Sequence, residues 1–354
     1  MYHVNEEIKN CTRIFPDQGR AGYLRLDMNE NPEGLPQEIV DQIKDEITPE
    51  FLATYPEPGV FMKKYANFIG VKEDNLCTTN GSDSAIRSVM QTFVGKGKEV
   101  VTVAPSFEMY MVNCWLLGLV HKPVPYEDDL TMDVNHIMEA IGEDTDMVVL
   151  LNPNNPLGNV YTEEEVRKVI EKARENEAVV VIDEAYHYFC ESTFLDLINE
   201  YDNLLILRTF SKCFSLAGVR LGVIIGDSTI IKYVTNLRLS FEVNTVALKC
   251  AEIVLDTPGL IDRLKQTERE GRNYVLCALK ENGYECFYGE GNFVFFKPKT
   301  GVETLKQRLF ENKILVKTYS NKMLSDWIRI NTGSKKVMEQ FMEKLLKVDA
   351  KEKV

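Results

Sequence analysis

Short apolar runs alternate with helical stretches through the middle of this 354-residue chain, and this alternation restricts the possible fold more than any other feature. Between two of the runs, residues 163–175 have helical character, and Thr162 and Glu165 stand at the spacing of a capping box. The pattern predicts an α/β fold in which a mostly parallel sheet carries helices on both faces. The strand-like runs are residues 100–103, 147–151, 179–182, 204–207 and 221–225.

Three of these runs lead into polar residues that suit a common chemical task. Lys212, Asp183 and Asn155 each lie at or just beyond the carboxyl end of a separate run. Parallel strands bring their carboxyl ends to one edge of a sheet, and ligands bind at that edge in open α/β folds. We therefore expect the three side chains to surround a ligand.

The types of these residues point to pyridoxal phosphate. A lysine can form a Schiff base with a carbonyl cofactor, and a carboxylate such as Asp183 keeps a pyridine nitrogen protonated, so that the ring accepts electrons. Asn155 and Tyr186 can hydrogen-bond the phenolic oxygen, and the ring of Phe107 can stack on the pyridine. Singly, these residues also fit a surface lysine, a helix N-cap, a turn amide or core aromatics. Their combination favours the cofactor site.

A second group of residues fits the phosphate of the same cofactor. Gly81, Ser82 and Asp83 precede a stretch with helical character, and backbone N–H groups at a helix start bind anions. Ser211 and Arg220 lie on either side of the lysine, and a planar guanidinium matches phosphate oxygens. An ordinary capped helix start is the alternative explanation of the first three residues.

Taken in order, these segments resemble those of the fold-type I (class I and II) pyridoxal phosphate-dependent aminotransferases, and the chain is most similar to the histidinol-phosphate aminotransferase family. The resemblance runs from about Leu26 to the C-terminal helix. It implies an aspartate aminotransferase-like fold with a seven-stranded sheet, and a homodimer in which Tyr55 reaches the cofactor phosphate of the other subunit. The matching motifs are Asn29-Glu30-Asn31-Pro32-x-Gly34, Tyr55-Pro56, Asn80 to Asp83, Pro105 to Phe107, Asn152 to Gly158, Asp183 to Tyr186 and Ser211 to Arg220.

The resemblance also implies a set of substrate-binding residues: Arg329, Lys317, Asn292 and Asn31. Arg329 matches an arginine that holds the substrate carboxylate in a bidentate pair. Where Lys317 stands, the family usually has an arginine that binds the substrate's phosphate, and a lysine offers a point charge without the fork. Residues 15–20 also depart from the family pattern, as does Ser84 at a usually acidic position. These departures leave the amino donor open.

The function implied by the resemblance is transamination from an amino donor to a 2-oxo acid such as 2-oxoglutarate, as in histidine biosynthesis. Lys212 would hold the cofactor and then move a proton on the substrate, while Asp183 would stabilise the charged ring. The alternatives are transamination of another amino acid, for example an aromatic one, decarboxylation of the threonine-phosphate decarboxylase type, and cofactor binding without catalysis. A pure binder needs neither Lys212 nor Arg329, which disfavours the last alternative.

Two domains are expected from the length and the order of the elements. Residues 45–255 would form the large cofactor-binding domain, while residues 1–44 and 256–354 would form a smaller α+β domain. The second part shows a long helical stretch at 260–282, followed by two strand-like runs and two further helices.

Composition narrows the class of protein. The formal net charge of −13 argues against nucleic acid and anionic membranes as partners, and no apolar run is long enough to span a bilayer. The eight cysteines are scattered, and the four histidines lack the spacing of metal ligands. We therefore expect free thiols, no metal and a cytoplasmic location.

Overall fold

The computed structural model describes residues 2–4, 6–9 and 19–350. The N-terminal segment that differs from the family pattern is residues 15–20, and residues 15–18 of it lie outside the described residues. The first described helix is α1 (Glu6–Lys9). Nowhere in the described ranges is there a helix with the length and apolar character needed to cross a membrane.

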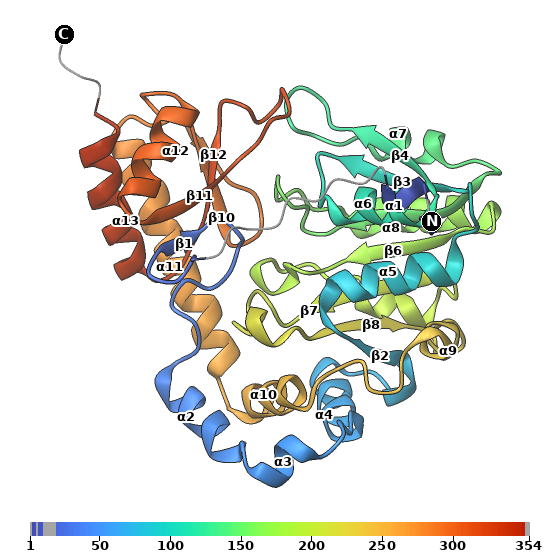
Figure 1. Ribbon diagram of the computed structural model, residues 1–354. Helices are drawn as coiled ribbons and strands as arrows, with labels where there is room; N and C mark the ends of the chain where they lie inside the picture. The colour runs from blue at the N-terminus through green and yellow to red at the C-terminus, as the bar shows by residue number, and fades with distance from the viewer. Residues whose placement is uncertain (1, 5, 10–18, 351–354) are drawn as a thin grey trace.

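A large sheet forms the centre of the molecule (Figure 1). Within the described residues it has seven strands in the order β2-β8-β7-β6-β5-β3-β4. Neighbouring strands are parallel except at β8, which is antiparallel to both β7 and β2. The predicted mostly parallel sheet is confirmed. The strands are β2 (Leu76–Thr79), β3 (Glu99–Ala104), β4 (Val120–Pro125), β5 (Thr145–Leu151), β6 (Val179–Asp183), β7 (Leu204–Thr209) and β8 (Gly222–Gly226).

The two edge strands of the large sheet, β2 and β4, were not predicted from the sequence. β2 has four residues, two of them threonines, and β4 contains two prolines, so neither shows the continuous apolar run of a central strand. Proline suits an edge because a strand there needs fewer ladder hydrogen bonds.

Helices cover both faces of the large sheet, as predicted. Alternate side chains of each strand enter two separate cores: Val148 and Leu150 of β5 pack on one face, Val149 and Leu151 on the other. α5, α6 and α9 cover the second face, and α4, α7, α8 and α10 the first. The helices are α4 (Gly59–Ile69), α5 (Gly81–Phe93), α6 (Met109–Leu117), α7 (Val134–Ala140), α8 (Glu163–Glu175), α9 (Ser228–Leu237) and α10 (Thr245–Asp256).

The start of α8 confirms the predicted capping box. The Glu165 N–H donates to Thr162 Oγ1 at 3.3 Å, and Glu165 Oε2 accepts from the Thr162 N–H at 2.7 Å. Short 3₁₀ helices connect several other elements: η1 (Glu73–Asn75), η2 (His187–Phe189), η3 (Leu195–Asn199) and η4 (Ala217–Val219).

A smaller mixed sheet carries its own core and takes segments from both halves of the chain. Its strand order is β1-β11-β12-β10-β9, and β1 pairs in parallel with β11. The helices and two of the strands match the predicted α+β elements, whereas β1, β9 and β11 are short or mixed in polarity. The strands are β1 (Leu24–Leu26), β9 (Cys286–Phe287), β10 (Phe293–Phe296), β11 (Ile314–Thr318) and β12 (Ile328–Asn331); the helices are α11 (Leu260–Glu281), α12 (Val302–Glu311) and α13 (Lys335–Val348).

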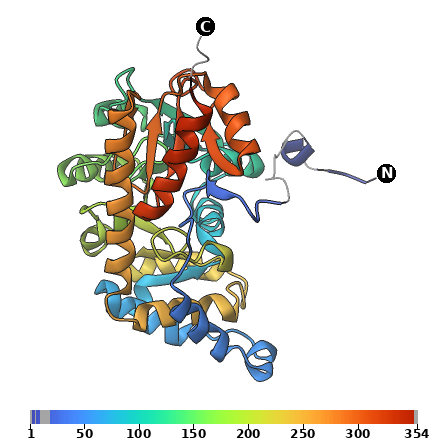
Figure 2. The ribbon, with the colours of Figure 1, turned by 90° about the vertical axis from the view of Figure 1, so that its left-hand side faces the viewer.

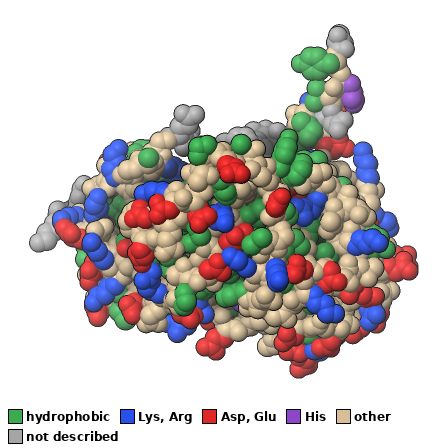
Figure 3. Space-filling view, turned by 90° about the horizontal axis from the view of Figure 1, so that it is seen from below, with side chains coloured by type: hydrophobic (Ala, Val, Ile, Leu, Met, Phe, Trp, Pro, Cys, Tyr) green, Lys and Arg blue, Asp and Glu red, His purple; other side chains and the backbone are tan. Residues whose placement is uncertain are grey.

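α11 links the two parts, running from beside α10 up to the small sheet (Figures 1 and 2). Two N-terminal helices, α2 (Gln37–Glu46) and α3 (Pro49–Ala53), follow β1. α2 packs against α10 of the large part, so the chain crosses from the small sheet to the large one before residue 46. Acidic and basic side chains are interspersed over the face seen from below in Figure 3.

A buried ion pair joins the ends of β6 and β7. The carboxylate of Glu184 accepts from Arg208 Nε at 2.9 Å and from Nη2 at 2.8 Å, and both side chains are almost fully buried. Glu184 also accepts from the Phe194 N–H at 2.8 Å. Desolvation makes such a pair sensitive to the loss of either partner, because the remaining charge stays buried.

We predict that Glu184→Ala lowers the free energy of unfolding by about 3–5 kcal/mol, because it leaves the Arg208 charge buried and unpaired. Urea unfolding of the cofactor-free protein measures the change. Glu164→Ala is the matched control, since its ion pair with Lys168 lies on the surface and contributes little. Equal effects of the two substitutions would contradict the prediction.

Candidate active site

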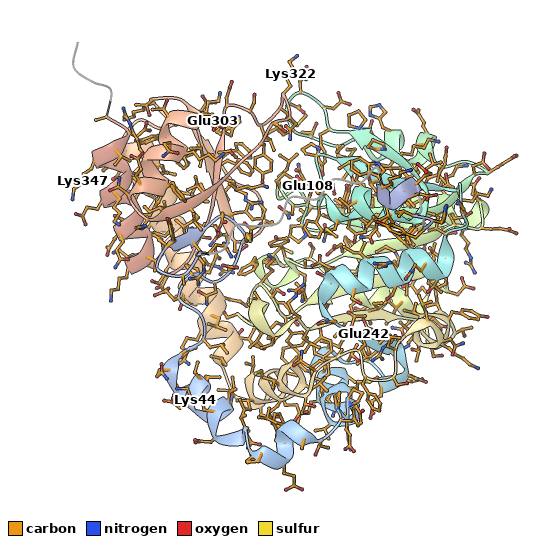
Figure 4. The ribbon with its side chains drawn as sticks, viewed as in Figure 1. Lys44, Glu108, Glu242, Glu303, Lys322 and Lys347 are labelled. Carbon is orange, nitrogen blue, oxygen red and sulfur yellow. The ribbon has the colours of Figure 1, made fainter. Side chains whose placement is uncertain are left out.

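A cavity of about 590 Å³ lies at the carboxyl edge of the large sheet and reaches the small sheet. Figure 4 shows Glu108, one of the residues that line it, between the two sheets. Eleven of the residues expected at the site line this cavity: Ser82, Asp83, Phe107, Asn155, Asp183, Tyr186, Ser211, Lys212, Lys317, Arg220 and Arg329.

Four other expected residues lie outside the lining. Gly81 lies next to Arg220, which lines the cavity. A Cβ at Gly81 would lie 2.5 Å from the Arg220 guanidinium. Asn31 donates to the Gly34 carbonyl at 3.0 Å and to Ser215 Oγ at 2.8 Å. The two remaining residues are Asn292, which donates to the Asn29 carbonyl, and Tyr55, which is exposed on the surface.

Lys212 follows β7 and reaches back toward the N-terminal segment. Its Nζ donates to the Met28 carbonyl at 2.8 Å and lies 5.6 Å from the centre of the Tyr186 ring. Burial, with a further contribution from the charge of Arg329, lowers the pKa of the Lys212 amine to about 8. More of this amine than of an ordinary lysine is therefore neutral near physiological pH, and a neutral amine can attack a carbonyl carbon.

Asp183 ends β6 and is held by two donors. Tyr110 Oη donates to Oδ2 at 2.9 Å, and the Ala185 N–H donates to Oδ1 at 3.0 Å. Burial raises the pKa of Asp183 to about 6, against the opposing effect of these hydrogen bonds. A cationic ring nitrogen beside the carboxylate would favour its ionised form. Tyr110 was missed from the sequence, because a buried tyrosine in an apolar helix looks like core.

The start of α5 and Arg220 lie together at one end of the cavity. Arg220 donates to Asp83 Oδ2 at 3.0 Å and to Ser211 Oγ at 3.3 Å. Gly81 has φ of +77°, and β8 packs so closely that a Cβ at Gly222 would lie 2.7 Å from the Gly81 carbonyl carbon. The helix start and a guanidinium therefore lie close together, and both kinds of group suit a phosphate.

Glu242 supplies a carboxylate beside this turn and was also missed from the sequence. It accepts from the Asn80 N–H at 3.3 Å and from the hydroxyl of Ser84. Figure 4 shows Glu242 near the start of α5. The acidic residue that the family usually has at position 84 is replaced here by a serine that contacts a carboxylate from elsewhere in the chain.

Two cationic side chains lie at the small-sheet end of the cavity. Lys317 and Arg329 stand opposite each other in the pairing of β11 with β12. Arg329 donates to Asn155 Oδ1 and to the Asp27 carbonyl, both at 2.8 Å, while its Nε is buried without a hydrogen-bond partner among the described residues. Both cations lie over the ring of Tyr319, which the sequence did not indicate.

Comparison with known proteins agrees with this geometry. Residues 21–345 match the family described as aminotransferase class I and II. A histidinol-phosphate aminotransferase from Thermoanaerobacter pseudethanolicus is 33% identical over 335 residues, 94% of each chain, and one from Chlorobaculum tepidum is 31% identical over 353 residues, 98% of this chain and all of its own. The crystal structure of histidinol-phosphate aminotransferase from Sinorhizobium meliloti in complex with pyridoxal-5'-phosphate shares the fold, with a TM-score of 0.87, 21% identity and 98% of each chain covered.

The chain belongs to the class I and II aminotransferase family. It is a pyridoxal phosphate-dependent aminotransferase of the histidinol-phosphate aminotransferase-like type. The cavity fits that cofactor: an amine of lowered pKa, a buried carboxylate and a helix start beside a guanidinium lie around one space. The predicted family, fold, cofactor and class of enzyme are confirmed, and the roles of the individual residues remain predictions.

We predict that the cofactor attaches to the cofactor-free protein through Lys212, and faster as the pH rises, with a midpoint near 8. The neutral amine is the reactive form, and its fraction increases above the lowered pKa. Absorbance after mixing with pyridoxal phosphate measures the rate, and borohydride reduction followed by mass spectrometry locates the adduct. An adduct on another lysine, or a midpoint near the usual value of about 10.4, would contradict this assignment; Lys212→Ala is the control.

Proposed function

We propose that this aminotransferase takes a phosphorylated amino alcohol of the histidinol phosphate type as its amino donor and 2-oxoglutarate as its acceptor, which places it in histidine biosynthesis. The observation that carries the proposal is the side-by-side position of Lys317 and Arg329 at the small-sheet end of the cavity. Two adjacent cations suit a phosphate in one half-reaction and two carboxylates in the other. The relatives named histidinol-phosphate aminotransferases support the same donor.

When bound, pyridoxal phosphate supplies an electron sink for the substrate's α-carbon. In the proposal, the neutral amine of Lys212 would take the proton from that carbon and would then give it to the carbon that carried the cofactor's aldehyde. Asp183 would keep the ring nitrogen protonated, and Tyr186 and Asn155 would hydrogen-bond the phenolic oxygen. Phe107 would pack against the ring of the cofactor.

The phosphate of the cofactor is assigned to the other end of the site. Ser82, Ser211 and Arg220 supply side-chain donors there, together with the backbone N–H groups at the start of α5. The two ends of the cavity would thus hold two different anions, and the reacting atoms would lie between them, beside Lys212.

An aromatic amino acid is the alternative donor favoured by a specific observation. The rings of Phe107, Tyr186 and Tyr319 line the cavity, and such a surface accepts a flat side chain as readily as an imidazole. For a donor of this kind Arg329 would bind the carboxylate, and Lys317 would have no phosphate to contact.

We predict that Lys317→Ala raises KM for histidinol phosphate about 10- to 100-fold, the value of one charge-assisted hydrogen bond, and barely changes KM for an unphosphorylated donor. Steady-state kinetics with paired phosphorylated and unphosphorylated donors measures the difference. Lys317→Arg is the matched control, because it restores the family's usual residue and keeps the charge. If instead Arg329→Ala is the more damaging change on every productive donor and Lys317→Ala has no effect, the donor is a plain amino acid.

We further propose that the chain works as a homodimer with shared sites. Leu52, Tyr55, Leu239 and Phe241 are all more than half exposed, and the rings of Tyr55 and Phe241 stack at 4.3 Å. Apolar side chains gathered in this way favour burial against another chain. Phe241 also precedes Glu242, which contacts the start of α5, so this surface adjoins the phosphate end of the site.

Mixing Tyr55→Phe subunits with Lys212→Ala subunits is predicted to restore activity at low cofactor concentration. In a mixed dimer with shared sites, one of the two sites regains both native residues. Activity after subunit exchange, with sedimentation velocity at the assay concentration, checks the prediction. No gain on mixing, or an active monomer, would rule out shared sites.

A further inference from the structure

Asn29 lies at the junction of the small sheet with the cavity and is fixed from the small-sheet side. It is 1% exposed, and its φ of +56° is in the left-handed region, which asparagine tolerates better than most residues. Its N–H donates to Asn331 Oδ1 at 3.2 Å, and its carbonyl accepts from Asn292 Nδ2 at 3.1 Å. Asn331 also donates to the Glu30 carbonyl at 2.9 Å. The backbone of Asn29 is therefore tied to the end of β12 and to the residue before β10.

The side chain of Asn29 points the other way, toward the large sheet. Its Nδ2 donates to the hydroxyl of Tyr186 at 2.8 Å, and both side chains are buried. The adjacent Met28 carbonyl accepts from Lys212 at 2.8 Å. Two successive residues of one N-terminal segment thus contact two residues that line the reacting part of the cavity.

The contact with Tyr186 determines what that hydroxyl can do. A phenol carries a single hydrogen, and an amide nitrogen can donate but not accept. Because the Tyr186 hydroxyl accepts a hydrogen bond from Asn29 Nδ2, the hydroxyl hydrogen of Tyr186 is not donated to that nitrogen. Tyr186 lines the cavity, so the hydrogen is free to be donated there.

We propose that Asn29 is a positioning residue that keeps the Tyr186 hydroxyl oriented as a donor to the phenolic oxygen of the cofactor. The inference rests on the proposed role of Tyr186. Donation to that oxygen stabilises its negative charge and opposes protonation of the bound cofactor. Without the amide of Asn29, the hydroxyl can turn, the donation weakens, and protonation becomes easier.

The test is a pH titration of the absorbance of the bound cofactor in the native enzyme and its variants. Asn29→Gly removes the amide but keeps the left-handed backbone accessible. It should move the midpoint of the absorbance change to higher pH, by about half a pH unit or more. Asn29→Asp places an acceptor where the donor was and captures the Tyr186 hydrogen, so the same direction is expected. Because aspartate also tolerates this backbone, the second variant keeps the test valid if the glycine variant folds poorly.

Tyr186→Phe supplies the reference and separates the possible failures. It should move the midpoint in the same direction, and Asn29→Gly should add nothing further in that background, since the two residues act on one hydrogen bond. If Tyr186→Phe leaves the midpoint in place, the role of Tyr186 is wrong and the inference falls with it. If Tyr186→Phe moves the midpoint but neither Asn29 variant does, only the inference on Asn29 is overturned.

Two further outcomes would also contradict the positioning role of Asn29. A midpoint that moves to lower pH in Asn29→Gly would mean that the amide is reversed and competes for the Tyr186 hydrogen. Additive shifts in the double variant would mean that Asn29 acts by another route. Asn203→Ala is the matched control, because its amide bonds the backbone carbonyls of Ile170 and Ala178, away from the cavity, and should leave the midpoint unchanged.

Discussion

The parallel pairing of β5, β6 and β7 is the constraint on which the site depends. Leu151 pairs with Asp183, and Asp183 with Leu207, so β5 and β6 end at one level of the sheet and β7 ends two residues beyond it. The ion pair of Glu184 with Arg208 joins the residue after β6 to the next residue of β7. Because the ends are aligned, the loops that follow begin at a shared edge, and Lys212 and Asn155 come to the same cavity as Asp183. A shift of one strand by one residue would turn these side chains to the opposite face.

The charged side chains around the cavity form three groups: Asp183 and Lys212 in the middle, and a set of cationic groups at each end. Buried Asp183 has a raised pKa and two hydrogen-bond donors, whereas Lys212 has a lowered pKa with Arg329 nearby. Arg220 lies with the start of α5 at one end of the cavity, and Lys317 lies with Arg329 at the other. Desolvation weakens the preference of the lysine and of the aspartate for their charged forms. A charged cofactor or substrate can therefore change the protonation state of Lys212 and of Asp183.

The parts of the site that could be predicted are those that a local pattern marks. Lys212 and Asp183 follow continuous apolar runs, and the helix start at Gly81 shows as a turn before a helical stretch. The parts that could not be predicted come from segments remote in the chain: Tyr110 on Asp183, Glu242 on Ser84, and Asn29 on Tyr186. In sequence these residues are a core tyrosine, a surface acid and a turn asparagine. The edge strands and β1 were missed for a related reason, since their stability comes from the neighbour they pair with and not from their own composition.

The pairing of β1 with β11 has a consequence for the order in which the protein is assembled during synthesis. Leu24 pairs with Ile314, so β1 is synthesised early but can pair only after β11 has left the ribosome. The large sheet uses residues between 76 and 226 and can form before that, because domains fold largely as units in the order of synthesis. Met28 lies two residues after β1, so we expect its contact with Lys212 to form only after the small sheet closes. In a nascent chain we therefore expect the edge that carries Lys212 to be uncovered, and cofactor that arrives at this stage to meet an open site.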